Sequence, residues 1–200
     1  MMDPIEIGAR ALAERRIVGS TQPGGLYHSE GCTNWPLELR HDATAMRDAM
    51  FPRQHGDAVI FDIDGTLADV EHRRGYLEGD NPNWAAFNAA IGDDRVHQNV
   101  FRLARTLNAA GNAIILCSGR DGGFRRLTEL WLTFNEVGYD GLYMRSAGDG
   151  RKDHVVKMEL LDQIISDGFK PWLVVDDRSS VVAAWRARGL TCLQCAEGNF

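Results

Sequence analysis

The stretch that most constrains the fold is residues 58–67, an apolar run that ends in two carboxylates. Residues 58–61 read Ala-Val-Ile-Phe and residues 62–67 read Asp-Ile-Asp-Gly-Thr-Leu. A short run of this kind predicts a strand buried on both faces of a parallel sheet. Buried charges are costly unless they are paired or used, and ligands of open α/β sheets bind outside the carboxyl ends of the strands. We therefore expect chemistry at Asp62 and Asp64.

From residue 57 onward, strand and helix patterns alternate. Apolar segments predict strands at 57–63, 113–117, 141–145, 172–175 and 190–193, and amphipathic segments predict helices at 96–110, 123–137, 152–166 and 179–188. Alternation of this kind predicts right-handed βαβ crossovers. The expected fold class is α/β: a three-layer α/β/α sandwich with a central parallel sheet.

The connection between the first two predicted strands, residues 64–112, is much longer than the later ones. Its predicted helix at 96–110 leaves residues 69–92 as an insertion. Long connections inside compact domains are usually lids or binding segments. Because the insertion begins beside the two aspartates, we expect a small cap over the site, carrying the side chains His72, Arg73, Arg74, Tyr76, Trp84 and Phe87.

Residues 1–56 form an N-terminal extension to a domain at 57–200. Helices are predicted near 5–17 and 37–50, with a Gly- and Pro-rich loop between them. The spacing of His28, Cys32 and His41 fits no zinc pattern, so surface or packing roles are expected. The sequence leaves two interpretations of the extension open: an arm for homo-oligomerisation or docking, and an ordered brace along the domain.

Composition and charge exclude several classes of protein. The chain has 200 residues and a formal net charge of -6, whereas proteins that grip long duplex DNA usually have a basic balance. Any nucleic-acid contact should therefore be short, local or terminal. No apolar stretch approaches the roughly 20 residues of a membrane span, and no apolar signal core begins the chain. We expect a cytoplasmic protein without membrane partners.

The spacing of Cys192 and Cys195 is that of a redox motif. The surrounding residues alternate like a strand, however, and residues three apart on a strand point to opposite faces. We expect the four cysteines to be small buried hydrophobic residues in a reducing compartment.

Four polar clusters lie at or near the predicted strand ends. They are Asp62-Ile63-Asp64-Gly65-Thr66, Ser118-Gly119-Arg120, the pair Asp153 and Lys157 in the helix before the fourth strand, and Asp176-Asp177-Arg178. Each cluster alone is a weak signal. An isolated Asp-Asp is commonly a helix cap, as we expect for Asp93-Asp94. In this order and on these elements, the four clusters together indicate one kind of active site far more strongly than any single cluster does.

Over residues 57–200 this set resembles the haloacid dehalogenase superfamily of phosphotransferases. A closer resemblance is to the 3′-phosphatase domains of bacteriophage polynucleotide kinase–phosphatases, carried by residues 62–68, 118–120, 151–157, 176–178, 185–186 and 194–200. It implies removal of a 3′-terminal phosphate from DNA, RNA or a nucleoside 3′-phosphate. The Gly-x-x-x-x-Gly-Lys-Ser/Thr loop of the kinase half is absent, so we expect no 5′-kinase activity.

Phosphoryl transfer needs a nucleophile, positive charge for the phosphoryl oxygens and a proton donor for the leaving group. Asp62 can attack phosphorus and form an aspartyl-phosphate. Asp64 can protonate the leaving oxygen and then activate water as general acid and base. Dehalogenating members of the superfamily lack this second acid. Mg²⁺ would be held, as in the relatives, by Asp62, the Asp64 carbonyl, Asp176 and Asp177.

The remaining predicted site residues bind the phosphate or position other groups. Lys157 would bridge the nucleophile and the phosphate, with Asp153 one helical turn earlier to hold it. Ser118 and the backbone near Gly119 would bind a phosphoryl oxygen, and Thr66 is assigned to substrate binding. The resemblance adds Arg73 and Arg120 as phosphate contacts, since Arg presents a planar fork to phosphate oxygens.

Other interpretations remain open at this point. The acidic charge and small cap also suit a phosphatase of small nucleotides or other small phosphomonoesters. A non-catalytic binding module is disfavoured because every predicted catalytic position is intact. Arg145, Arg151 and Lys152 could form a rim that guides a nucleic-acid strand, or could be ordinary solvated surface.

Overall fold

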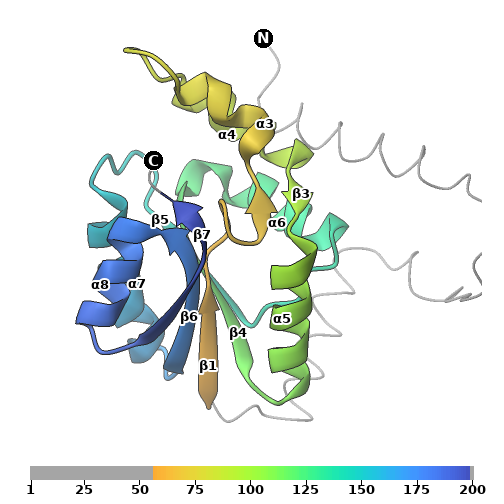
Figure 1. The fold of residues 1–200 in the computed structure, drawn as a ribbon, viewed down its shortest axis with the longest axis vertical. Coiled ribbons are helices and arrows are strands. Elements are labelled where there is room, and N and C mark those ends of the chain that lie inside the picture. Colours follow the sequence, from red (N-terminus) through yellow and green to blue (C-terminus); the bar gives the residue numbers. More distant parts are fainter. Residues whose placement is uncertain (1–55, 199–200) are drawn as a thin grey trace, which may run out of the picture.

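In the computed structural model, residues 56–198 are described, and they form a five-stranded sheet with helices on both faces (Figure 1). All neighbouring strands are parallel, in the order β5-β4-β1-β6-β7. The predicted α/β fold class is confirmed. The strand predicted from residues 57–63, which is β1, lies in the centre of the sheet. The strands are β1 (Asp57–Phe61), β4 (Ala113–Asp121), β5 (Gly141–Arg145), β6 (Lys170–Arg178) and β7 (Thr191–Gly198).

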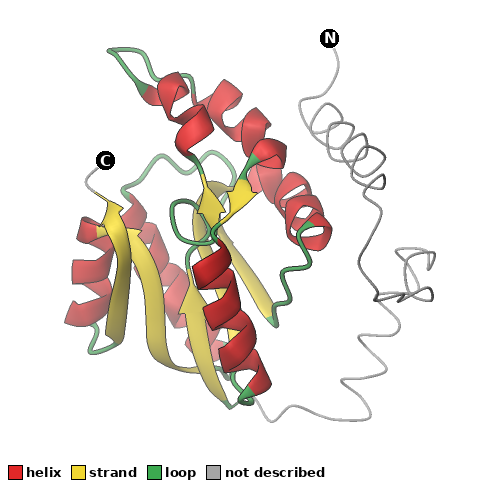
Figure 2. Cartoon of the chain, turned by 45° about the vertical axis from the view of Figure 1, so that its right-hand side comes forward, coloured by secondary structure: helices red, strands yellow, loops and turns green. Residues whose placement is uncertain are grey.

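Two pairs of helices enclose the sheet (Figure 2). Val59 and Phe61 of β1 pack with the first pair, and Ala58 and Ile60 pack with the second pair. Because both faces of β1 are covered, all four side chains are 0% exposed, which explains the continuous apolar run. The first pair is α5 (Gln98–Ala109) and α6 (Arg125–Phe134), and the second pair is α7 (Asp153–Ser166) and α8 (Ser179–Ala187).

Strands β4 and β6 run further than the sequence predicts. They were expected to end at residues 117 and 175, and they end at Asp121 and Arg178. Both strands shift register near their ends, between Ser118 and Asp121 and between Asp176 and Arg178. The apolar pattern stops at residues 117 and 175, although backbone pairing continues beyond them. The clusters at residues 118–120 and 176–178 therefore lie within the ends of β4 and β6 instead of after them.

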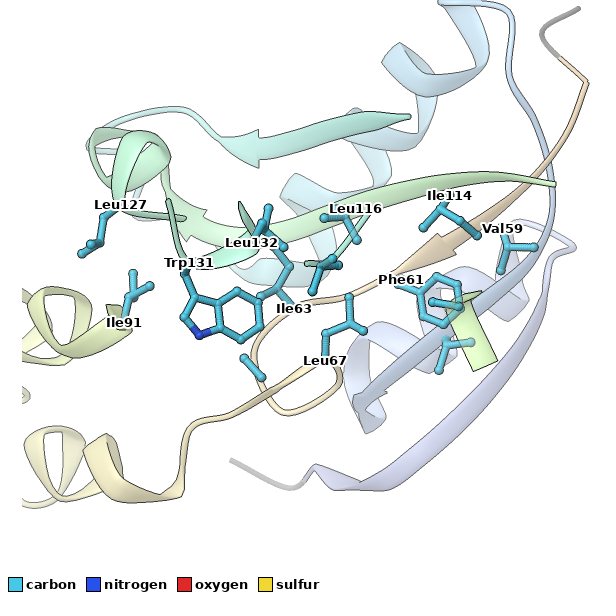
Figure 3. Packing of buried hydrophobic residues seen from close by; sticks show 14 of the residues in the cluster. Val59, Phe61, Ile63, Leu67, Ile91, Ile114, Leu116, Leu127, Trp131 and Leu132 are labelled. Carbon is cyan, nitrogen blue, oxygen red and sulfur yellow. The ribbon is translucent and has the colours of Figure 1, made fainter. Parts of the chain in front are cut away.

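The predicted insertion is a small helical segment that lies beyond the carboxyl end of β1 (Figure 1). An antiparallel pair of short strands, β2 (Ala68–Asp69) and β3 (Arg95–Val96), joins it to the sheet domain. Ile91 is fully buried and belongs to the core cluster that contains Trp131 (Figure 3). The segment contains α3 (Glu71–Arg74), η1 (Gly75–Leu77), α4 (Trp84–Ala89) and η2 (Ala90–Asp93).

Three of the cysteines lie in the described residues, and all three are free thiols. Cys117 and Cys192 are buried as expected, and burial raises the pKa of Cys192 to about 12. Cys195 is exposed, so the prediction of a buried residue is wrong there. Among the helices of residues 56–198, none is both long and apolar enough to cross a lipid bilayer. The expectations for residues 1–55, including His28, Cys32, His41 and the arm or brace, lie outside the described residues.

Candidate active site

Three buried carboxylates meet where β1 and β6 end. Asp62 directly follows β1, and Asp176 and Asp177 belong to β6. One oxygen of each lies within 4.8 Å of the others. The two strands are parallel neighbours, and the Asp62 amide donates to Val175 O at 3.0 Å. Parallel pairing therefore brings these aspartates together although they are far apart in the sequence.

The ammonium group of Lys157, on α7, faces this cluster. Its Nζ donates to Asp62 Oδ1 at 2.7 Å and to Asp176 Oδ2 at 2.8 Å. Asp153, one helical turn earlier, lies 3.7 Å from Nζ. Burial alone would lower the pKa of Lys157, but Asp176 and Asp62 raise it well above its ordinary value. Lys157 is therefore a permanent positive charge beside Asp62.

The carboxylate cluster has the donor chemistry of a site for a hard divalent cation. Burial raises the pKa of Asp62 well above its ordinary value despite Lys157, and Asp176 and Asp177 add to the increase. One ammonium group thus does not balance three carboxylates. Oxygen-only donors are the set that Mg²⁺ and Ca²⁺ prefer. The residues present fit a divalent cation, which would restore the ionised form of Asp62.

Gly65 makes the tight turn that leads the chain away from Asp62 and Asp64. Its φ is +85°, and a Cβ added there would lie 2.3 Å from Asp177 Oδ2. The next residue, Thr66, is fully buried, and its Oγ1 lies 3.5 Å from Asp177 Oδ1. This turn therefore fixes the position of Asp177 by close contact.

Replacement of Gly65 by Ala should reduce activity far more than stability. Gly79 provides the matched control, because its φ is +83° but no atom lies within 4 Å of an added Cβ. Both variants should lose about 1–2 kcal/mol of stability from the left-handed backbone. Only Gly65→Ala should displace Asp177, lowering the turnover rate at this site by about 10- to 100-fold. Urea unfolding and initial rates test this; equal activity losses would contradict it.

The Asp64 carboxylate points away from the other three and is held by two arginines. Its Oδ1 accepts from Arg73 Nη2 at 2.5 Å and from Arg120 Nη2 at 2.6 Å. Burial would raise the pKa of Asp64, but the charges of Arg120 and Arg73 outweigh it and lower the pKa. Asp64 is therefore an ionised, oriented carboxylate two residues from Asp62.

A fourth carboxylate, Asp94, completes the arginine cluster and was missed by sequence reasoning. Its Oδ2 accepts from Arg73 Nη2 at 2.8 Å and from Arg120 Nη2 at 2.9 Å, and Trp131 Nε1 donates to its carbonyl at 2.9 Å. The side chain is 0% exposed. Asp94 does follow η2 as its C-cap residue, but its side chain binds the two arginines instead of capping a helix. The available signal was that two arginines assigned to a buried site need carboxylate partners.

Of the two arginines predicted as phosphate contacts, only Arg120 lines the cavity described below. Arg73 is 0% exposed and does not line the cavity described below. Its guanidinium lies 4.0 Å from the ring centroid of Phe87. Arg120 does line the cavity, but its guanidinium also binds Asp64 and Asp94. Both arginines thus position Asp64 within the described structure.

The Ser118-Gly119-Arg120 segment packs against Asp153. Ser118 is fully buried, and its Oγ accepts from the Arg120 amide at 3.2 Å. An added Cβ at Gly119 would lie 2.0 Å from Asp153 Oδ1, so only glycine fits this close approach. Arg145 Nε donates to Gly119 O at 2.8 Å, and Arg145 Nη2 lies 3.2 Å from Asp153 Oδ1. Arg145 is therefore an internal brace and not a free surface charge.

These groups surround a cavity of about 520 Å³, a volume typical of small-molecule sites. Thr66, Arg73, Ser118 and Asp176 lie behind the cavity wall and contact the residues that form it. The predicted site residues that line it are Asp62, Asp64, Gly119, Arg120, Asp153, Lys157 and Asp177.

The central parallel sheet, its flanking helices and the acidic cluster at the strand ends define a member of the haloacid dehalogenase superfamily of phosphatases. Within it, the chain belongs to the family of polynucleotide kinase PNKP phosphatase domains, which it matches over residues 56–200.

Similar proteins agree with this assignment. A chain in the structure of the Pnkp1/Rnl/Hen1 complex is 34% identical with a TM-score of 0.62, covering 72% of this chain and 46% of that one. A chain of the Pnkp1/Rnl/Hen1 RNA repair complex is 33% identical with a TM-score of 0.62, covering 72% and 43%. A protein of Autographa californica nuclear polyhedrosis virus, described as a bifunctional polynucleotide kinase/RNA ligase, is 29% identical over 138 residues, which are 68% of this chain and 18% of the relative. The chain thus spans less than half of each of these relatives.

Proposed function

We propose that this protein removes 3′-terminal phosphate from polynucleotides or nucleoside 3′-phosphates through an aspartyl-phosphate on Asp62. The observation that carries the proposal is that two carboxylates with different partners, those of Asp62 and Asp64, line the same cavity. Asp62 lies 2.7 Å from Lys157 Nζ, and Asp64 is held by Arg73 and Arg120. Membership in the PNKP phosphatase-domain family and the RNA repair complex of a structural relative support a polynucleotide end as substrate.

In the first step, an Asp62 oxygen attacks phosphorus and the bond from phosphorus to the 3′ oxygen breaks. Lys157 lies beside Asp62 and offsets the negative charge of the phosphoryl oxygens. Asp64 gives its proton to the leaving 3′ oxygen. A dianionic phosphate beside Asp64 opposes the effect of the arginines and favours the protonated form that this step requires.

In the second step, water attacks the phosphorus of the aspartyl-phosphate. Once the alcohol has left, Asp64 is ionised, the state that Arg120 and Arg73 stabilise. Asp64 accepts a proton from the attacking water, the bond from phosphorus to Asp62 breaks, and inorganic phosphate leaves. Asp62 is regenerated as a carboxylate.

The cluster of Asp62, Asp176 and Asp177 would hold Mg²⁺, with the Asp64 backbone carbonyl as a further ligand. When bound, the ion lets an anionic nucleophile approach an anionic phosphate. Trp185 Nε1 donates to Asp176 Oδ2 at 3.1 Å and Gln194 Nε2 donates to Asp177 O at 2.8 Å. These two contacts position the aspartates before any ion binds.

Removal of divalent cations with EDTA should abolish phosphate release, and added Mg²⁺ should restore it. Without a cation, Asp62 is buried with two more carboxylates, which raise its pKa and weaken it as a nucleophile. Initial rates across a Mg²⁺ titration, with Ca²⁺ added separately as a larger oxygen-binding ion, provide the measurement. Full activity in EDTA would contradict the assignment of the cluster.

A substrate panel tests the proposed specificity. The substrates are a 3′-phosphorylated oligonucleotide, the same oligonucleotide with a 5′-phosphate, a 3′-mononucleotide, a 5′-mononucleotide and a sugar phosphate. We expect release from 3′-phosphates in preference to all others. A preference for 5′-phosphates or sugar phosphates would instead support the second candidate, a phosphatase of small phosphomonoesters, which the net charge of -6 also suits. We expect no transfer of phosphate from ATP to a 5′ end.

A further inference from the structure

The outer part of the active-site cavity carries a large exposed aromatic side chain. Trp84, the first residue of α4, is 57% exposed and lines the same cavity as Asp62 and Asp64. Tryptophan is usually buried to a large extent in folded proteins. Its exposure at the mouth of a site that already holds the reacting groups makes it available to a ligand.

Contacts on the insertion hold Trp84 at a fixed place relative to Asp64. Its ring meets Phe87 edge to face, with 5.8 Å between centroids and 78° between planes. Phe87 is buried under the guanidinium of Arg73, which binds Asp64. The Asn83 side chain accepts from the Ala86 amide at 3.0 Å and caps α4 where Trp84 begins it. The indole therefore belongs to the same connected structure as Asp64.

The loop of residues 148–152 supplies a cation to the same cavity. Arg151 is occupied by ion pairs with Asp149 at 2.7 Å and Glu159 at 2.6 Å. Lys152 is exposed and lines the cavity. Its ammonium group has no partner among residues 56–198. Besides Asp62, Asp64 and Lys157, the cavity thus offers the exposed indole of Trp84 and the ammonium group of Lys152.

An exposed indole such as that of Trp84 can bind a flat aromatic group, and an ammonium group such as that of Lys152 can bind a phosphate. Stacking of nucleobases on aromatic side chains tolerates any base sequence, because every base has a π face. We propose that Trp84 stacks on the base of the 3′-terminal nucleotide and that Lys152 pairs with the phosphate on its 5′ side. This inference rests on the proposed 3′-phosphatase function and gives the site a preference for polynucleotide ends over other phosphomonoesters.

Single-stranded oligonucleotides with a 3′-phosphate on either a normal or an abasic terminal residue test the role of Trp84. The wild type should show a kcat/KM about 5- to 100-fold higher for the normal end. Trp84→Ala should collapse this ratio to near one, whereas Trp84→Phe should retain most of it. Trp172 is the matched control, since it is 47% exposed on β6 and does not line the cavity. Trp172→Ala should keep the wild-type ratio.

The role of Lys152 is tested with a 3′-mononucleotide and a 3′-phosphorylated dinucleotide. Lys152→Ala should lower kcat/KM for the dinucleotide by about two- to five-fold at low salt and by less at high salt. The control variant Lys170→Ala should keep the wild-type kcat/KM for the dinucleotide, since Lys170 is exposed at the start of β6 and does not line the cavity.

The failures of the two proposals are distinguishable. If the wild type releases no phosphate from any 3′ end, the proposed function is wrong, and the proposed stacking site is wrong as well. If the wild type acts on 3′ ends but Trp84→Ala affects normal and abasic ends equally, only the stacking site is wrong. Circular dichroism of each variant shows whether the fold is retained, and Trp84→Phe provides a readout if Trp84→Ala does not fold.

Discussion

Replacement of Asp62 by Asn should lower phosphate release from a 3′-phosphorylated oligonucleotide by on the order of 10⁴- to 10⁶-fold. The amide cannot attack phosphorus, so the covalent route is lost. The change is nearly isosteric, and it removes one negative charge from a buried cluster where burial, Asp176 and Asp177 raise the pKa of Asp62. The free energy of unfolding should therefore fall little or rise. Initial rates and urea unfolding measure the two effects separately.

Asp57 gives the matched control for this substitution. It is the exposed first residue of the same strand, at the end opposite to the site. Asp57→Asn makes the same chemical change and should leave kcat and KM within a factor of about two. If Asp62→Asn kept a substantial part of wild-type activity, Asp62 would not be the nucleophile.

Replacement of Asp94 by Ala should damage both stability and activity. Asp94 is 0% exposed and pairs with the equally buried Arg73 and Arg120. Removal of one partner from a buried ion pair costs about 3–5 kcal/mol, because the remaining charges lose their compensation. The two arginines would also lose the contacts that orient them toward Asp64. We expect a drop in kcat/KM on the order of 100-fold from misplacement of Asp64.

Asp94→Asn separates the charge of this residue from its shape. It keeps one carbonyl acceptor for the arginines and should cost less stability, about 1–3 kcal/mol. Asp80→Asn is the control, since Asp80 is an exposed residue of the insertion that precedes Asp94. Wild-type unfolding midpoints and rates for Asp94→Ala would show that the arginine cluster does not depend on Asp94.

The sheet and the carboxylate cluster were predictable because both follow from patterns local to each strand. The apolar run at residues 58–61 predicted a doubly covered central strand, and Val59 and Ile60 do face opposite helix layers. Parallel strands bring their carboxyl ends to one edge of the sheet, so Asp62, Asp176 and Asp177 were expected to meet there. Their oxygens lie within 4.8 Å of one another.

The partners of the arginines were not predictable from spacing alone. Asp93-Asp94 follows a short apolar run inside the insertion, and such a pair commonly caps a helix. Asp94 is instead buried, because Trp131 Nε1 donates to its carbonyl and two guanidinium groups neutralise its side chain. These contacts join segments that are far apart in the sequence, and the periodic pattern of apolar residues does not predict them. For the same reason Arg73 was expected to face the phosphate, whereas it lies behind Asp64.

The most direct test of the two-carboxylate mechanism uses Asp64→Asn with an aryl phosphate, whose leaving group needs no proton. Attack by Asp62 should then proceed, while hydrolysis of the aspartyl-phosphate should be slow because the general base is missing. We predict a burst of one aryl alcohol per active site, with a phosphoryl group on the peptide that contains Asp62. Linear release by Asp64→Asn without any phosphorylated Asp62, or a phosphoryl group on another residue, would contradict the account.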